Sequence, residues 1–558
     1  MRLSEEILCM IYLTSKRSVG GGNSQLSTLN TKHLTAKRSI WVLVLWFGVA
    51  FGYAQTTVHI ANPQEWKNTE LKAYVGQTVV FDCPMYITYN AYGRYSVSPR
   101  RLYSPTNQAL PKSEEYKAIS TLNAYGQMSI SNLPGYHRCG EMIDGLTVSV
   151  ESSSSISYVS GTFRGNTRTD MERALPPLNQ KGEPRLIVCA ANLEYYLVEQ
   201  LGGSMGPRDE AAHQKQRAKV SKALAKIGAD IYGLVEVQQG QKAMEEIAAD
   251  LTANTGHPYD YVDDGGSASG TYTKSGYVYR ADKVQPEFKL FENNSVVQNR
   301  KKIQCFRELD GDTDDANDEY FLFSLNHFKA KSGTGTGLDA DQGDGQGIFN
   351  YSRTQEALSV INQYGSVSST TQEPDILIMG DLNAYAMEDP IMTLTSAGMI
   401  DLHRAFHADS SYSYVFGGKA GYLDHALSNS TLFPQITGMA AYHLNSDESD
   451  EYTYDKSSDQ TMFRYSDHDP ILVGLALEKT LQYNPDMNIT RNGSTLIINN
   501  AGSTEGKSFY RIYTLQGLLL EEAEIRNSQY EVRAPASTGV YIIQVFYDGK
   551  VTTLKVGI

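Results

Sequence analysis

Cysteine is scarce in this sequence, and no Cys-x-x-Cys pair occurs among its five cysteines. A thiolate zinc site of that type therefore has no support. Cys83 and Cys139 fall within one predicted domain and could form a disulfide in an oxidising compartment. Cys189 and Cys305 lie inside apolar strand patterns, which is typical of cysteines that act as small buried hydrophobic residues.

Basic residues are also too few to outnumber acidic ones. The chain has 49 Lys and Arg against 63 Asp and Glu, a formal net charge of −14. Tight nucleic-acid binders normally show a basic footprint, which this composition lacks. A nuclease is not excluded, because a metal ion and a few local cations can neutralise one phosphate while the remaining surface stays acidic. The charge therefore indicates transient contact with any nucleic acid.

The sequence has no apolar run of the length that spans a membrane. Residues 40–51 form a run of about a dozen residues, whereas roughly 20 are needed. Lys37 and Arg38 precede this run and small residues follow it, the order typical of a secretory signal peptide. We therefore predict a leader at residues 1–55, a mature chain that starts near Gln55, and no stable membrane span after cleavage. A transmembrane anchor is the alternative.

The chain is too long for one hydrophobic core, and its patterns change along its length. Residues 56–180 contain β-branched segments separated by turn residues, which predicts a small β domain. After a proline-rich linker, residues 184–478 mix buried strands with amphipathic helices, which predicts an α/β layered domain. Residues 486–558 show short, regularly spaced strands joined by Gly and Asn turns, which predicts a small β-sandwich.

Polar side chains interrupt or end several apolar runs of the α/β region. An unpaired buried carboxylate costs several kcal/mol, so such groups are tolerable at strand ends if they converge on a shared metal or substrate. Open α/β sheets bind ligands at the carboxyl ends of their strands. Oxygen ligands favour Mg²⁺, Mn²⁺ or Ca²⁺ over zinc. The residues at these positions are Asn192, Glu236, Asn326, His327, Lys329, Asp381, Asn383, Asp424, Asp467, His468 and Asp469.

This ordered set resembles the endonuclease/exonuclease/phosphatase superfamily, whose best-known member is pancreatic deoxyribonuclease. The resemblance covers residues 184–478 and implies a four-layer α/β/β/α sandwich, flanked by the small N-terminal β domain and the C-terminal β-sandwich. Two stretches, DADQGDGQGIFNYSRTQEAL (339–358) and GDLNAYAMEDPI (380–391), are similar to large extracellular bacterial nucleases of the superfamily.

The resemblance also implies a role for each candidate site residue. Glu236 and Asp467 look like ligands of Mg²⁺ or Mn²⁺, with Asn192 beside them. His468 looks like the general base that activates water, and Asp424 looks like the partner that orients it.

The remaining candidates look like residues that handle the phosphate. Asp381 and Asn383 would position the water and the scissile phosphate, and His327 would contact a non-bridging oxygen or the leaving group. Arg300 stands where many members carry a phosphate-binding arginine, although Lys301 and Lys302 replace the usual prolines after it. A structural Ca²⁺ is a further expectation, and Asp339, Asp341 and Asp344 could hold it, unless their segment is a flexible loop over the site.

The flanking regions show resemblances of their own. The C-terminal region resembles the sorting domain of type IX secretion, which implies a secretion-machinery partner and a secreted or cell-surface protein; a carbohydrate-binding sandwich is the alternative. The first region resembles an OB-type domain, which could hold single strands by stacking on tyrosine or could serve as a spacer.

We therefore predict a secreted, divalent-metal-dependent phosphodiesterase that hydrolyses DNA or also RNA with little sequence specificity. A phospholipid or sugar-phosphate phosphodiesterase of the same superfamily is the second hypothesis. A catalytically degenerate surface-binding protein is the third.

Overall fold

The computed structural model describes most of residues 55–557, and the predicted leader lies outside the described residues. The contacts between residues divide the chain into two compact units. One unit holds the described residues of Met1–Leu102, Ala118–Asp170 and Gly417–Lys419, and the other holds those of Tyr103–Lys117, Met171–Phe416 and Ala420–Ile558. The internal segments that are not described are 166–172, 266–271, 294–299, 310–317, 459, 478–481, 484–487, 493–494, 500–507, 515–517, 526–528, 534–539 and 548–549.

The first unit is built around a β-barrel. Strand β7 pairs with both β5 and β6, so the strands β6-β3-β4-β5-β7 close on themselves, and β2 and β1 extend the sheet beyond β6. Closure removes the exposed edges that an open sheet would leave. Apolar side chains such as Val79, Ile87 and Ile143 fill the interior. The elements are β1 (Gln55–Val58), η1 (Asn68–Tyr74), β2 (Thr78–Phe81), β3 (Met85–Ala91), β4 (Arg94–Ser98), α2 (Glu114–Gly126), β5 (Met128–Ser131), β6 (Met142–Val150) and β7 (Ser155–Arg164).

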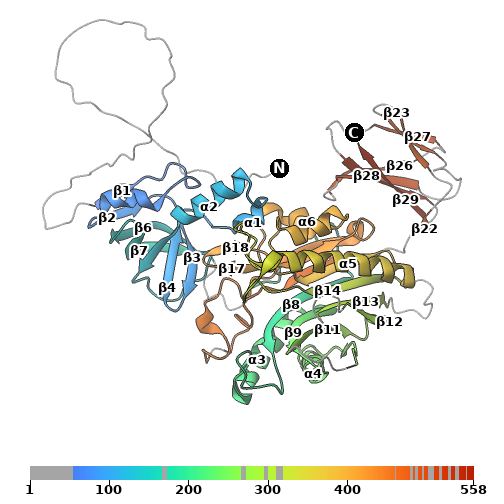
Figure 1. The fold of residues 1–558 in the computed structure, drawn as a ribbon, viewed down its shortest axis with the longest axis horizontal. Helices are drawn as coiled ribbons and strands as arrows, with labels where there is room; N and C mark the ends of the chain where they lie inside the picture. Colours follow the sequence, from blue (N-terminus) through green and yellow to red (C-terminus); the bar gives the residue numbers. More distant parts are fainter. Residues whose placement is uncertain are drawn as a thin grey trace, which may run out of the picture. The chain divides into compact units, whose positions relative to one another are not determined.

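The second unit is a mixed α/β structure with two six-stranded sheets at its centre (Figure 1). The first sheet has the order β10-β11-β9-β8-β21-β20, and the second has the order β12-β13-β14-β15-β19-β16. One buried cluster contains side chains from both sheets, among them Val188, Ile231, Phe323 and Leu377, so the sheets pack face to face. The strands are β8 (Leu186–Tyr196), β9 (Ile231–Gln238), β10 (Tyr259–Tyr261), β11 (Thr273–Arg280), β12 (Val284–Glu292), β13 (Lys301–Glu308), β14 (Tyr320–His327), β15 (Ile376–Asp381), β16 (Ile400–Asp401), β19 (Asp424–Ser428), β20 (Ile436–Ala441) and β21 (Ile471–Leu475).

Helices cover the outer faces of both sheets. Val220 of α3 and Met244 of α4 pack in one cluster with the first sheet, and Val360 of α5 and Ile391 of α6 pack in another with the second. The order of layers agrees with the sandwich expected for residues 184–478. The helices are α3 (Glu210–Ile227), α4 (Lys242–Thr255), α5 (Asn350–Thr371), α6 (Asp389–Ser396) and α7 (Leu402–His407).

Local sequence signals set the ends of the first two of these helices. The Asp209 side chain accepts a hydrogen bond from the Ala212 N–H at 2.8 Å and so caps α3. Gly228 and Gly256 end α3 and α4 with positive φ angles of 62° and 76°, a conformation that glycine adopts without steric cost. Both helices therefore end at glycines.

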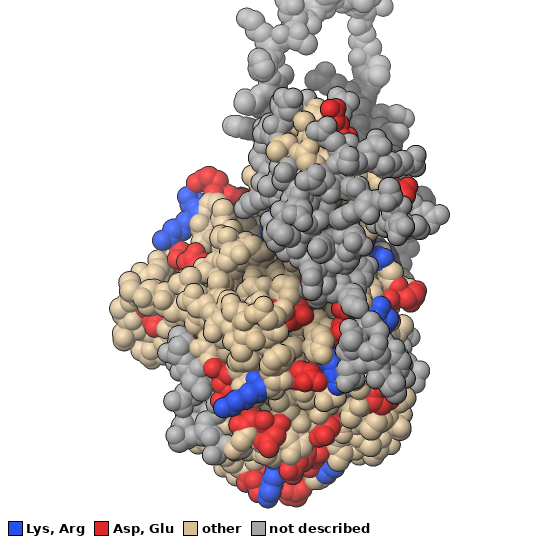
Figure 2. Space-filling model, turned by 90° about the vertical axis from the view of Figure 1, so that its right-hand side faces the viewer, with Lys and Arg blue, Asp and Glu red and all other residues tan. Residues whose placement is uncertain are grey.

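Figure 2 shows how charged side chains are distributed over one face of the molecule. Figure 2 shows acidic and basic side chains interspersed on the face that it presents, without a continuous basic patch among the coloured residues. This distribution agrees with the acidic composition, and on this face it offers no extended track for a nucleic-acid backbone.

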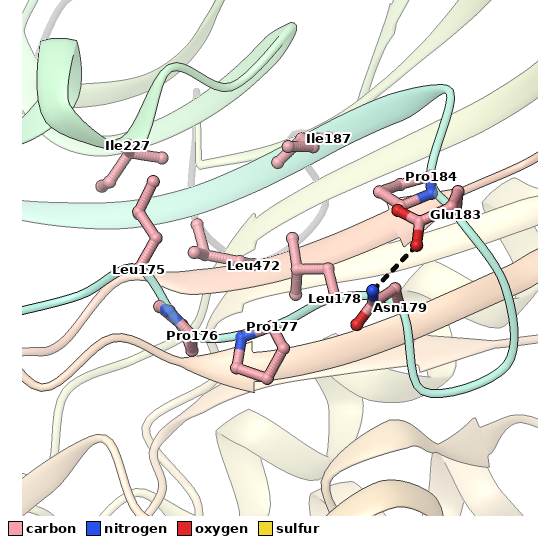
Figure 3. A pocket seen from close by; sticks show the side chains of 10 residues that line it. All are labelled: Leu175, Pro176, Pro177, Leu178, Asn179, Glu183, Pro184, Ile187, Ile227 and Leu472. Atoms are coloured by element: carbon pink, nitrogen blue, oxygen red, sulfur yellow. Dashed lines mark hydrogen bonds between the residues drawn. The ribbon is translucent and has the colours of Figure 1, made fainter.

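The predicted proline-rich linker lies along the edge of the first sheet. The Thr437 hydroxyl of edge strand β20 donates to the Leu178 carbonyl at 2.8 Å, and the Lys181 N–H donates to the Thr437 carbonyl at 2.7 Å. Figure 3 shows Leu178, Ile187 and Leu472 among the mostly apolar side chains that line a pocket, and none of the candidate site residues lines it. The segment thus covers a sheet edge instead of spanning open solvent.

Helix α1 (Pro105–Gln108) groups with the second unit, although the strands on either side of it in the sequence belong to the barrel. The Thr106 hydroxyl donates to Glu388 Oε1 at 2.8 Å. The Asn107 side chain accepts a hydrogen bond from the Tyr422 N–H at 3.0 Å, just before the start of β19. The contact pattern therefore assigns part of residues 56–180 to the α/β unit, while the function of that region stays a prediction.

The C-terminal region forms two further sheets with a shared core. Their orders are β22-β29-β28-β25-β26 and β23-β24-β27, and Ile498, Ile512 and Ile543 are buried between them. In the part of the chain that the structure describes, no helix is long and apolar enough to cross a membrane. The strands are β22 (Gln482–Tyr483), β23 (Asn488–Asn492), β24 (Thr495–Asn499), β25 (Ser508–Thr514), β26 (Leu519–Ile525), β27 (Gln529–Arg533), β28 (Val540–Tyr547) and β29 (Lys550–Gly557).

We expect Glu373→Gln to stabilise the protein at alkaline pH. Burial, with the charge of Asp375, raises the pKa of Glu373 to about 8. A carboxyl whose folded-state pKa exceeds its usual 4.5 binds more protons when folded than when unfolded, so stability falls as the pH rises from about 4.5 to about 8. The Asp375 N–H donates to Glu373 Oε1 at 2.7 Å, and the amide side chain of the variant keeps an acceptor oxygen for this bond. Thermal unfolding should show a gain of about 1–3 kcal/mol at pH 9 and little gain at pH 4. Equal gains at both pH values would mean that the change acts through packing.

Candidate active site

Five central strands place polar side chains at one end of the paired sheets. Asn192 of β8 lies one register position from Glu236 of β9. In the second sheet His327 of β14 is paired with Asp381 of β15, and Asp381 is paired with Asp424 of β19. The parallel pairs β8–β9 and β14–β15 bring carboxyl ends to this edge, and the antiparallel strand β19 brings its amino end there, so residues far apart in the chain meet.

His468 and Asp424 form a buried hydrogen-bonded pair. His468 Nδ1 lies 2.7 Å from Asp424 Oδ2, and the Ser413 hydroxyl donates to the same oxygen at 2.7 Å. A carboxylate at Nδ1 favours the proton there and leaves Nε2 free to take another. Burial by itself lowers the pKa of His468, but Asp424, Asp381 and Asp467 outweigh it and hold that pKa well above its usual value.

Asp381 lies between the two histidines of the site. Its Oδ2 is 3.8 Å from His468 Nε2 and 3.8 Å from His327 Nε2, and it accepts a hydrogen bond from Asn192 Nδ2 at 3.2 Å. Burial, with the charge of Asp424, raises the pKa of Asp381 to about 7. This carboxyl can therefore carry a proton near neutral pH.

Asn383 closes the turn that follows Asp381. Its N–H donates to Asp381 Oδ1 at 2.9 Å, and its Nδ2 donates to the Phe328 carbonyl at 3.1 Å. Its backbone is left-handed, with φ 49°, a conformation that asparagine tolerates better than most residues. Asn383 thus lies beside Asp381, with its amide nitrogen engaged by the backbone.

Three carboxylates gather on the other side of the site. Glu236 Oε2 accepts the Tyr195 N–H at 3.1 Å, and burial and the charge of Asp467 raise the pKa of Glu236. Burial and Asp467 also raise the pKa of Glu194 to about 8. The Glu194 Oε2 atom is buried and has no hydrogen-bond partner. Positive charges oppose these shifts, Arg464 at Glu194 and His468 and Arg300 at Glu236, but burial and the neighbouring carboxylates outweigh them.

The chemistry of this donor set fits a divalent cation. Glu194, Glu236 and Asp467, with the amide of Asn192, offer hard oxygen ligands of the kind that Mg²⁺ and Mn²⁺ prefer. Among the described residues, the acidic and histidine side chains whose ligand atoms all lie within 4.8 Å of one another are instead those of Asp381, Asp424 and His468. The 2.7 Å bond between Asp424 and His468, however, engages two of those groups with each other, which suits proton transfer better than metal binding.

His327 and Arg300 lie together at the edge of the carboxylate group. His327 Nε2 is 3.6 Å from Glu236 Oε1, and burial, with the charge of Arg300, holds the pKa of His327 well below its usual value. His327 is therefore neutral at neutral pH. The backbone N–H of His327 donates to the Arg300 carbonyl at 2.8 Å. The Nε atom of Arg300 is buried without a hydrogen-bond partner. Arg300 thus stands within electrostatic reach of the site.

The lysines after Arg300 do not extend a basic surface. Lys301 Nζ lies 3.3 Å from Glu356 Oε1, with both side chains fully buried. Lys302 Nζ lies 2.5 Å from Asp264 Oδ2. Each lysine is thus paired with a carboxylate inside the domain.

The sequence prediction missed three residues of the site. Glu194 follows Asn192 by two positions, and its acidic character at a strand end was the signal that could have revealed it. No local sequence pattern marks Ser413 or Tyr414, because only the tertiary fold brings these two residues to the site. The Tyr414 ring lies over His468, with ring centroids 4.6 Å apart.

Other polar residues at strand ends serve the scaffold. Asn326 Nδ2 donates to the Ser324 carbonyl of its own strand at 3.1 Å. Lys329 Nζ lies 4.5 Å from the centre of the Phe349 ring. Asp469 Oδ1 accepts the Asn445 N–H at 2.7 Å.

The aspartates considered for Ca²⁺ hold local turns. Asp339 accepts hydrogen bonds from Ser352 N and Oγ at 2.9 and 2.7 Å, and Asp344 accepts one from Gln346 N at 3.0 Å. Asp341 accepts one from Gly343 N at 2.9 Å. These engagements give no support for a calcium ion at this place.

The comparisons with known proteins match the α/β region. The model of the Endonuclease/Exonuclease/phosphatase family matches residues 200–468. This part of the chain is similar to that family. Family members hydrolyse phosphate esters, and most depend on a divalent metal. A search among curated proteins gave no match.

Solved structures that are similar to this chain include bacterial and human proteins. An endonuclease/exonuclease/phosphatase from Bacteroides vulgatus is 18% identical, and the match covers 52% of this chain and 99% of that chain with a TM-score of 0.35. The human Nocturnin catalytic domain is 10% identical, with 52% and 94% covered and a TM-score of 0.35. A mannosyl-6-phosphatase from Bacteroides thetaiotaomicron is 18% identical, with 52% and 100% covered and a TM-score of 0.34.

Proposed function

We propose that this protein is a secreted, divalent-metal-dependent phosphodiesterase that hydrolyses DNA or also RNA with little sequence specificity. The observation that carries the proposal is the buried Asp424–His468 pair, which faces Asp381 beside the carboxylates of Glu236 and Asp467. A base with its orienting carboxylate next to a set of oxygen ligands suits metal-assisted attack of water on a phosphate ester.

His468 takes the proton of the attacking water at Nε2. Asp424 at Nδ1 holds the ring in the required tautomer and stabilises the imidazolium that forms. Glu236 and Asp467, with Asn192 beside them, would hold a divalent cation, which when bound would supply positive charge at the phosphate and would favour the neutral form of His468.

Asp381 and Asn383 position the water and the scissile phosphate between the two histidines. The neutral His327 ring, with the Arg300 guanidinium near it, contacts a non-bridging oxygen or the leaving group. The acidic surrounding surface makes the contact with the polymer brief, because few phosphates beyond the scissile one are neutralised.

The proposal is tested by incubating the purified mature chain with plasmid DNA or an RNA strand. We expect degradation in Mg²⁺ or Mn²⁺ and none with an excess of chelator. Phospholipid and sugar-phosphate diesters serve as competing substrates. Hydrolysis of those alone, with nucleic acid left intact, would overturn the nuclease assignment, and inactivity on every substrate would favour a binding protein.

Ser413→Ala is expected to lower kcat about tenfold and to leave KM nearly unchanged. The hydroxyl donates to Asp424 at 2.7 Å, and a hydrogen bond to a charged group contributes about 1.5–3 kcal/mol. Without it Asp424 holds His468 less firmly. Steady-state kinetics on one defined oligonucleotide measures the effect, and an equal loss in Ser413→Thr would contradict it, because threonine keeps the donor.

We also propose that the flanking regions serve export and substrate capture. The proposal is supported by the closed five-stranded barrel of the first unit, since OB-type domains are also five-stranded barrels, and by the two C-terminal sheets, since a β-sandwich is the fold proposed for the sorting domain. N-terminal sequencing of exported protein should place the mature start near Gln55. A chain that ends at Glu478 should keep its catalytic activity but lose export.

A further inference from the structure

Three rings lie in series between the site and the surface of the α/β unit, those of His468, Tyr414 and Phe416, and we call this series the aromatic ladder. The Tyr414 ring lies 4.6 Å from the His468 ring. The Phe416 ring follows, with centroids 6.4 Å apart and only 8° between the two planes. Tyr414 and Phe416 bound the short strand β17 (Tyr414–Phe416), and residues two apart in a strand share a face.

Phe416 is the exposed end of this ladder. It is 69% exposed, whereas Tyr414 is half-buried and His468 is buried. A large aromatic side chain that is mostly exposed leaves ring surface available for stacking with a planar ligand. Because the ladder starts at His468, the proposed general base, the exposed face of Phe416 lies within reach of the group that is attached to the phosphate.

We propose that Phe416 is a stacking platform for a nucleobase next to the scissile phosphate. This inference rests on the proposed function and deepens it, because it identifies a substrate part that phospholipid and simple sugar-phosphate diesters lack. Stacking needs no hydrogen-bond readout, so it accepts every base and agrees with cleavage of little sequence specificity. It also gives an acidic protein a way to hold nucleic acid that does not depend on basic side chains.

A membrane is the competing occupant for an exposed aromatic side chain. One ring offers little apolar area, and even a whole acyl chain gives only marginal membrane attachment. The Phe416 ring is also nearly parallel to the Tyr414 ring, and this packing fixes its plane, whereas insertion into a membrane needs a freely oriented side chain. Both features favour a planar ligand over a lipid surface.

The test compares two single-stranded substrates of equal length and charge, one with all its bases and one built of abasic nucleotides. We expect the wild type to prefer the base-bearing strand by roughly 5- to 150-fold in kcat/KM, the range that stacking on one aromatic provides. Phe416→Ala should abolish this preference, and Phe416→Trp should keep it. Phe288→Ala is the matched control, because Phe288 is 54% exposed on β12, outside the candidate site, and its loss should change nothing.

Two further readouts separate the possible outcomes. In excess chelator, where the strand stays intact, the base-bearing strand should quench the indole fluorescence that Phe416→Trp adds more than the abasic strand does. Equal losses on both strands in Phe416→Ala would assign the ring a purely structural role and would overturn the proposal. Phe416-dependent sedimentation with phosphatidylcholine–phosphatidylserine vesicles would overturn it as well, in favour of a lipid surface. If the wild type cleaves both strands equally, the nuclease function is supported and the stacking platform is contradicted. If it cleaves neither strand with any metal, both proposals are contradicted.

Discussion

Replacement of His468 by alanine is expected to remove nearly all turnover while the fold and metal binding persist. His468 Nε2 is the atom assigned to take the proton from water, and Asp424 is bonded to the opposite ring nitrogen at 2.7 Å. General-base catalysis contributes about 10²–10⁴-fold, so kcat should fall by at least that factor. Single-turnover cleavage of a labelled oligonucleotide measures the loss, and calorimetric titration with Mn²⁺ checks that the cation still binds.

The partner of His468 provides the internal control. Asp424→Asn should also be severe, because it removes the charge that stabilises the imidazolium and can favour the wrong tautomer. The double variant should be little worse than His468→Ala alone, since both residues serve one proton transfer. If His468→Ala kept more than about a tenth of wild-type turnover, the base would be wrongly assigned and His327 would become the candidate.

Glu236→Gln is expected to cause a loss that added metal partly reverses. Glu236 and Asp467 are assigned as ligands, and the charge of Asp467 already raises the pKa of Glu236. The amide keeps an acceptor oxygen but loses the negative charge, so the site should bind its cation more weakly rather than not at all. Activity measured over a range of Mg²⁺ or Mn²⁺ concentrations should show a half-saturation point shifted upward by about tenfold or more.

The same titration separates ligands from the base. His468→Ala should stay inactive at every metal concentration, because its defect is the missing proton acceptor. Rescue of His468→Ala by metal, or a Glu236→Gln variant with an unchanged metal dependence, would contradict the division of roles. Asp339→Asn is a suitable control, because Asp339 caps a turn through Ser352 and its loss should leave the metal dependence unaltered.

The candidate site could be predicted from sequence to the extent that each residue ends or interrupts an apolar run. Glu236, Asp381 and Asp424 carry that signal, since a carboxylate in a buried strand is costly unless it meets a partner. The structure brings these three together with Asn192 and His327 at one end of the paired sheets. Their roles in catalysis stay predictions until the variants are measured.

Residues without a local signal could not be found in this way. Ser413 and Tyr414 lie in a turn-rich segment, and nothing in their spacing shows that one bonds Asp424 and the other covers His468. The docking of α1 through Thr106 onto Glu388 joins positions 282 residues apart in the chain. Such contacts depend on how sheets and loops pack, and side-chain periodicity carries no record of that packing.

The sequence by itself indicated the mixed α/β class of the central region and the polar residues that interrupt or flank its apolar runs. Periodicity, glycine caps and buried runs are local properties, so they can be read without the fold. The tertiary structure alone decided that Asp381 lies between two histidines, that Glu194 joins the carboxylates, and that Lys301 and Lys302 turn inward. The physical reason is that pKa values and ion pairs are set by burial and by neighbours that only sheet pairing brings within a few ångströms.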